Sequence, residues 1–103
     1  MVSTAGLLAA ENVAERCDDV AQVLRSLAHP VRLKILSHLV GRERTVNELT
    51  AICGVSQSGM SQVLKRMKGE GLLESRRSRQ FVFYRIADPK LHRLMRAVSG
   101  IYC

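Results

Sequence analysis

The sequence TVNELTAICGVSQSGMSQVLKRM, residues 45–67, decides the fold. Thr45 and Glu48 have the spacing of a capping box, which gives a first helix a defined start. Gly54 stands where a left-handed residue would end that helix, and Ser56 is suited to cap a second one. Two short amphipathic helices around such a tight turn predict a helix-turn-helix.

The second of these helices has two distinct faces. Its apolar side chains recur at the i, i+3, i+4, i+7 spacing of a buried stripe, which comprises Met60, Val63, Leu64 and Met67. Hydroxyls, amides and a lysine occupy another face, and such groups can meet base edges and phosphates in a major groove. The residues that we expect to contact DNA from this helix are Ser56, Gln57, Ser58, Ser61, Gln62 and Lys65.

Helices precede this motif, and a hairpin and a helix follow it. Apolar spacing predicts a helix over about 9–27, and Pro30 fits the first position of a helix that runs to about Val40. Residues 72–77 and 80–86 have the pattern of two strands, and Asp88 with Pro89 opens a last helix. We therefore predict an α+β, mostly helical winged helix-turn-helix with the order α-α-α-α-β-β-α.

The predicted hairpin is basic near its tip. A basic hairpin beside a helix-turn-helix is typical of a wing, which we expect to contact phosphates or the minor groove. The residues predicted to make these contacts are Arg76, Arg77, Arg79 and Gln80.

Composition agrees with a nucleic-acid partner. Sixteen Lys and Arg against nine Asp and Glu give a formal net charge of +7 over 103 residues, which favours a polyanion such as double-stranded DNA through counterion release. The length fits one domain over 1–103, with 1–8 expected to be flexible. No window approaches the roughly 18 apolar residues of a membrane span, and no signal peptide is recognised, so we expect a cytoplasmic protein without a membrane partner.

Two other functional classes compete with DNA binding. We find no glycine-rich phosphate loop, no paired catalytic carboxylates and no nucleophile with a spaced base, so neither an enzyme nor a cofactor is expected. A winged helix used only as a protein-interaction module is the alternative. Such a module would lack the basic wing and the polar face of the second motif helix.

Apolar stripes on the first and last helices predict a homodimer, because a small core covers only part of each stripe. The residues expected at the dimer interface are Val20, Leu24, Leu91, Leu94, Met95 and Val98. Two recognition helices would then reach successive major-groove faces of a near-palindromic site with half-sites about 10 bp apart.

Several motifs, in this order, resemble the ArsR/SmtB family of dimeric winged-helix repressors. They are LAHPVRLKIL at 27–36, VNEL at 46–49, SQS at 56–58 followed by SQ at 61–62, and FYR at 83–85. Together with ESRR at 74–77 and the ending IYC, they look most like the branch that contains BigR, SqrR, YgaV and HlyU, together with NolR. The resemblance covers about residues 20–103 and implies a repressor whose DNA affinity responds to an inducer.

The metal sites of that family are not matched. Its C-x-C-x-x-C pattern falls on Thr45, Asn47 and Thr50, which are not thiolate ligands. Asp88 and His92 lie four residues apart and lack the D-x-H spacing of the family's zinc site. We therefore expect no metal.

The resemblance also implies a thiol switch, because sensors of the BigR and SqrR branch oxidise two cysteines to a disulfide or polysulfide bridge. Cys103 matches one of them, but Ser37 stands in place of the other. Three accounts remain open. In the first, Cys17 replaces the missing partner, and the pair responds to a small oxidant or reactive sulfur species. In the second, the chain is a constitutive NolR-like regulator. In the third, Ser37 is an engineered replacement of cysteine. Cys53, at an apolar position, is expected to be a buried thiol outside any switch.

Overall fold

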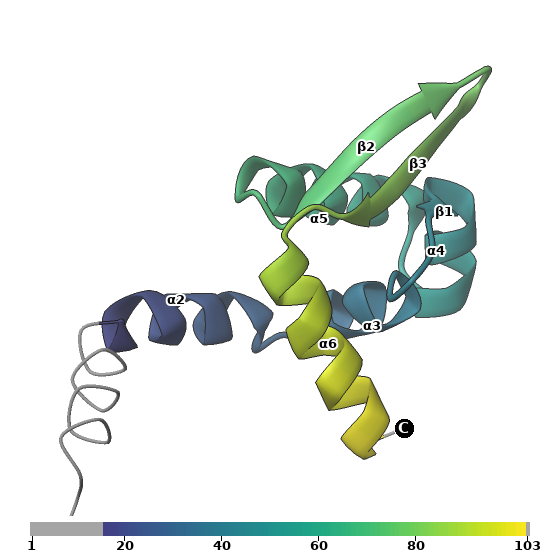
Figure 1. Cartoon of the computed structure of the whole chain (residues 1–103). Coiled ribbons are helices and arrows are strands. Elements are labelled where there is room, and N and C mark those ends of the chain that lie inside the picture. The colour runs from purple at the N-terminus through teal and green to yellow at the C-terminus, as the bar shows by residue number, and fades with distance from the viewer. Residues whose placement is uncertain (1–15, 103) are drawn as a thin grey trace, which may run out of the picture.

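A computed structural model of the chain describes residues 16–102 (Figure 1). The elements along the chain are the helices α2 (Cys17–Leu27) and α3 (Pro30–His38), the strand β1 (Arg44–Thr45), the helices α4 (Val46–Cys53) and α5 (Gln57–Gly69), the strands β2 (Leu73–Ser78) and β3 (Phe81–Ile86), and the helix α6 (Pro89–Tyr102). The segment 1–8, the predicted start of the first helix near residue 9, and Cys103 lie outside the described residues.

The predicted fold class is confirmed, with one added element. The two residues of β1 are too few to show the alternation that marks a strand in a sequence. This strand makes the hairpin a three-stranded antiparallel sheet in the order β1-β3-β2. Both hairpin strands begin one residue later than predicted, and α3 ends at His38 instead of Val40 because the chain turns there toward Gly41, whose φ is 74°.

Local signals fix the ends of the two motif helices as predicted. The Thr45 hydroxyl accepts from the Glu48 backbone N–H at 3.2 Å, and the Glu48 carboxylate accepts from the Thr45 backbone N–H at 3.2 Å. Gly54 ends α4 in the left-handed region, at φ 68°. The Ser56 hydroxyl accepts from the Gly59 backbone N–H at 3.1 Å and so caps α5. The turn between α4 and α5 is therefore held from both sides.

The apolar stripe of α5 anchors this helix in the core. Met60, Leu64 and Met67 are fully buried, while Val63 is half-buried against them. They pack with side chains from every other helix of the described chain, which are Leu27, Ile35, Leu36, Leu39, Leu49, Cys53, Leu91 and Met95 from α2, α3, the turn after it, α4 and α6. One face of α5 is thus fixed to the body, which leaves the opposite face in solvent.

The helix α2 extends away from this body (Figure 1). Leu27 is its one buried residue, and Val20 and Leu24 are each 52% exposed. These two predicted interface residues therefore present apolar surface that the described chain does not cover.

The apolar stripe of α6 divides between two environments, which corrects part of the predicted dimer interface. Leu91 and Met95 are 3% and 1% exposed because they pack into the core of their own chain, so they offer no surface to a partner. Leu94 and Val98 are half-buried. The large apolar side chains of α6 that are exposed are Ile101 and Tyr102 at its end. Among the described residues, no helix is long and apolar enough to cross a membrane.

Candidate nucleic-acid interface

The solvent face of α5, which we call the recognition helix, carries the predicted polar residues. Gln57, Ser58, Gln62 and Lys65 are exposed, whereas Ser61 is half-buried. The hydroxyl of Ser56 is already engaged as the helix cap. Two amides, a hydroxyl and an ammonium group thus stand on a rigid helix, and these are groups that can read base edges and phosphates.

Asn47 on α4 was missed by sequence reasoning. Its side-chain oxygen accepts a hydrogen bond from the side-chain amide of Gln57 at 3.3 Å. This contact crosses the turn between the two motif helices and orients Gln57 at the start of the recognition helix. The spacing of ten residues has no periodic signature, so the sequence offered no signal for it.

The wing, residues 73–86, projects far beyond the helices (Figure 1). At its tip Arg77, Arg79 and Gln80 are exposed, and within the described residues neither arginine side chain makes an ion pair or a hydrogen bond. Arg79 has a φ of 58°, in the left-handed region, because it begins the two-residue turn between β2 and β3. The wing tip therefore offers two guanidinium groups without a partner in the described chain.

Arg76 differs from these two arginines, although the sequence grouped all three. Its guanidinium donates to both carboxylate oxygens of Glu43, with Nε distances of 3.1 and 2.8 Å, and lies 4.4 Å from the ring centroid of Phe83. The hydrogen bond from Arg76 holds the pKa of Glu43 below its usual value, and the same bond raises the pKa of Arg76. Arg76 is thus engaged inside the chain.

Polar contacts also fix the far end of the recognition helix. Lys68 donates to the hydroxyl of Ser75 on β2 at 2.7 Å. Arg32 on α3 forms two hydrogen bonds with the carboxylate of Glu70, directly after α5, and donates to the backbone oxygen of Ser26 at 3.1 Å. These bonds connect α5 both to the wing and to the junction of α2 and α3.

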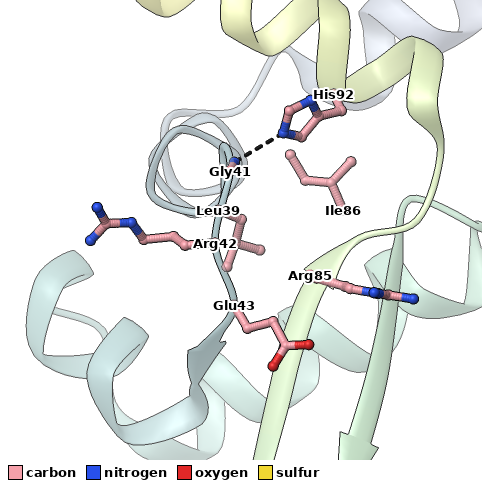
Figure 2. Close-up of a pocket in the computed structure, with 7 residues that line it drawn as sticks. All are labelled: Leu39, Gly41, Arg42, Glu43, Arg85, Ile86 and His92. Carbon is pink, nitrogen blue, oxygen red and sulfur yellow. Dashed lines mark hydrogen bonds between the residues drawn. The ribbon is translucent and has the colours of Figure 1, made fainter.

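A cavity of about 270 Å³ lies between the loop after α3, the sheet and α6 (Figure 2). On its wall the backbone N–H of Gly41 donates to His92 Nε2 at 2.9 Å, which joins that loop to α6. This contact gives His92 a structural role that its sequence position did not indicate. Arg42 and Arg85 also line the cavity, but their side chains point away from each other, so the two positive charges do not converge on one site (Figure 2).

Comparison with known proteins identifies the family. Residues 27–76 match a family model described as a helix-turn-helix domain. The HTH-type transcriptional regulator YgaV of Escherichia coli is 38% identical over 87 residues, which are 84% of this chain and 88% of YgaV. The chain belongs to the ArsR/SmtB family of winged-helix transcriptional regulators. This confirms the assignment that the sequence motifs indicated, both to the family and to the branch that contains BigR and YgaV.

Solved structures of ArsR/SmtB-type proteins share this fold. The crystal structure of the transcriptional repressor BigR from Xylella fastidiosa has a TM-score of 0.81 at 36% identity and covers 90% of this chain and 95% of BigR. Mb0332 from Mycobacterium bovis is described as a homodimeric winged helix-turn-helix DNA-binding domain and a possible ArsR-family transcriptional regulator. Its structure has a TM-score of 0.69 at 35% identity, and the match covers 86% of this chain and 82% of the Mb0332 chain. These relatives are transcriptional regulators, and so is this chain.

Among the described residues, the positions considered for metal binding or thiol sensing lie in different surroundings. The described residues contain no group of three or more His, Cys, Asp or Glu side chains placed to hold a metal ion. The Ser37 hydroxyl donates to the backbone oxygen of Leu33 at 2.6 Å. Cys17 is exposed at the start of α2. Cys53 is buried as predicted, and this burial raises the pKa of its thiol.

Proposed function

We propose that this regulator represses transcription by binding a near-palindromic operator through the recognition helix and the wing. The observation that carries the proposal is the exposed polar face of α5, which is backed by an apolar stripe whose members Met60, Leu64 and Met67 are fully buried. Gln57 and Gln62 read base edges, Ser58 and Ser61 assist them, and Lys65 contacts phosphate. Arg77, Arg79 and Gln80 extend the contact to the neighbouring groove or its phosphates.

The operator is bound by a homodimer in this proposal. Val20, Val23 and Leu24 on α2 and Ile101 and Tyr102 on α6 are exposed apolar side chains, and their burial against a second copy would favour association. The description of Mb0332 as homodimeric supports the same assembly. A two-fold axis between the copies then sets the half-site spacing at about one helical turn of DNA.

Selection of binding sites from random duplexes tests the proposal. The selected sites are expected to contain two inverted half-sites about 10 bp apart, and purified protein should bind them at least about 10³-fold tighter than scrambled DNA. Selection of unrelated sequences, with equal affinity for scrambled duplexes, would leave the chain as a protein-interaction module.

We further propose that oxidation or persulfidation of Cys17 and Cys103 releases the operator. The exposure of Cys17 supports this assignment, because a reactive thiol must meet its oxidant. The alternative is a constitutive NolR-like regulator. Ser37 supports this alternative, because it stands in place of one of the two cysteines that sensors of the BigR and SqrR branch oxidise.

A further inference from the structure

The ion pair between Glu43 and Arg76 spans the whole sheet. Glu43 directly precedes β1, Arg76 lies on β2, and the strand between them is β3. Phe83 of β3 is the register partner of both Thr45 and Arg76. The guanidinium of Arg76 therefore crosses the middle strand over the Phe83 ring to reach the carboxylate, and its NH2 atom lies 2.7 Å from Glu43.

This pair lies at the last level at which a third strand pairs with the wing. The strand β1 pairs only with Phe83 and Tyr84, so that from Val82 to the tip β3 pairs with β2 alone. Glu43 also stands two residues before Thr45, the cap of α4. The pair thus connects the wing directly to the start of the helix-turn-helix.

Two of the three guanidinium nitrogens of Arg76 are already engaged at this level. Its Nε and one terminal nitrogen face the Glu43 carboxylate, and its plane covers an aromatic ring, an arrangement that favours a fixed guanidinium. If Arg76 turned to a phosphate, it would leave the Glu43 carboxylate unpaired close to a polyanion. Arg77 and Arg79 have no such competing partner in the described chain.

We propose that Glu43 and Arg76 form a clamp that sets the angle of the wing against the helix-turn-helix, and that Arg76 stays paired with Glu43 on DNA. This inference rests on the proposed DNA-binding function. It makes both residues positioning residues: the clamp orders the wing in advance, so that less conformational entropy is lost on binding. In this proposal, Arg77 and Arg79 are the wing residues that neutralise DNA phosphates.

Salt dependence distinguishes a clamp from a phosphate contact. Each neutralised phosphate adds about 0.9 to the slope of log affinity against log salt. We expect Arg77→Ala, the matched control from the neighbouring position, to lower the slope by about that amount. Arg76→Ala is expected to keep the slope and to weaken binding by a similar factor at every salt concentration. A slope lowered as much as in Arg77→Ala would overturn the proposal.

In the Glu43→Gln variant, the direction of the change in DNA affinity distinguishes a clamp from simple withholding of Arg76. If Glu43 merely withheld Arg76 from DNA, removing the carboxylate would strengthen binding and steepen the slope. A clamp predicts weaker binding although the protein becomes more positive by one charge. The charge-swapped variant Glu43→Arg with Arg76→Glu keeps the net charge and the pair, and is expected to recover most of the affinity lost in Arg76→Glu alone.

A readout without DNA separates this inference from the proposed function. Backbone order parameters of residues 78–81 in the free protein are expected to fall in Glu43→Gln and to stay unchanged in Arg77→Ala. Unchanged order parameters in Glu43→Gln would overturn the clamp even if DNA binds as proposed. A fall in those values, with no operator found for the wild type, would instead retain the clamp and remove the DNA-binding function.

Discussion

Arg32 donates hydrogen bonds to both carboxylate oxygens of Glu70, at 2.6 and 3.2 Å, and thereby joins α3 to the end of the recognition helix. The Arg32 side chain is only 12% exposed and also holds the backbone oxygen of Ser26. We expect Arg32→Ala to lower the free energy of unfolding by about 1–3 kcal/mol, because hydrogen bonds to a charged group are lost and the partly buried carbonyl of Ser26 loses a donor. Glu70→Gln is expected to cost less than about 1 kcal/mol, since its carboxylate is partly exposed. Urea unfolding of both variants measures the difference, and equal effects would contradict this account.

The same pair predicts a dependence of stability on pH. The hydrogen bond from Arg32 holds the pKa of Glu70 below its ordinary value of 4.5. A carboxyl with a lowered pKa in the folded state stabilises the protein above its unfolded pKa, and this contribution is lost as the pH falls through the folded pKa. The stability difference between wild type and Glu70→Gln is therefore expected to shrink below about pH 4.5. In an Arg32→Ala background, the Glu70→Gln difference should be small and nearly independent of pH.

Base reading by the recognition helix predicts a loss of sequence preference. Gln62→Ala is expected to weaken binding to the selected operator by about 1–3 kcal/mol and to change affinity for scrambled DNA little. Asn47→Ala is expected to give part of the effect of Gln57→Ala, because Asn47 orients the Gln57 amide. Lys65→Ala is the control, and should weaken binding to both duplexes alike. Equal losses on both duplexes for Gln62→Ala would move base reading away from α5.

The turn of the wing allows charge and conformation to be tested at one residue. Arg79 has a positive φ, which glycine adopts without steric cost. Arg79→Gly is expected to keep stability within about 1 kcal/mol of the wild type, since relief of strain offsets the entropy of glycine. It should nevertheless lower the salt slope of DNA binding by about 0.9. Thermal unfolding and binding titrations measure the two effects, and an unchanged slope would remove Arg79 from the interface.

The exposed stripe of α2 predicts that assembly and folding can be separated. Leu24→Glu is expected to give a folded monomer, because Leu24 is half-exposed in the single chain and a buried carboxylate at a dimer interface is costly. Met95→Ala is expected to lower the free energy of unfolding by about 2–5 kcal/mol, since it leaves a cavity in the core. Sedimentation with circular dichroism distinguishes these outcomes, with the exposed Gln22→Glu as the control on α2. A dimer that persists in Leu24→Glu would place the interface elsewhere.

The sequence predicted those features whose signals are local. The capping box, the left-handed Gly54 and the Ser56 cap each involve residues within four positions, and all are confirmed. Contacts between elements were not predictable, because periodicity shows which face of a helix is apolar but not what covers it. The α6 stripe is an example, since its apolar spacing is the same for Leu91 in the core and for side chains at the surface. Three of the polar pairs that the sequence missed join residues 33, 38 and 51 positions apart: Arg76 with Glu43, Arg32 with Glu70, and Gly41 with His92.

The proposed thiol switch predicts that Cys17 reacts and Cys53 does not. Cys53 is only 8% exposed, and burial raises the pKa of its thiol, so little thiolate forms and oxidants have poor access to it. Peroxide is expected to link Cys17 and Cys103, with two thiols oxidised and the peroxide reduced to water. Because Cys17 lies on α2, the link would shift a helix of the proposed dimer interface and so weaken operator binding.

Mass spectrometry measures the Cys17–Cys103 link, and a DNA-binding assay on the same samples measures the release of the operator. The double variant Cys17→Ser with Cys103→Ser is expected to stay on DNA under peroxide or persulfide, with Cys53→Ser as the matched control that is still released. Release of the double variant like the wild type would contradict the Cys17–Cys103 switch and indicate another sensing site. A wild type that stays on DNA under oxidant would favour the constitutive regulator, and a bridge that includes Cys53 would contradict the assignment of the pair.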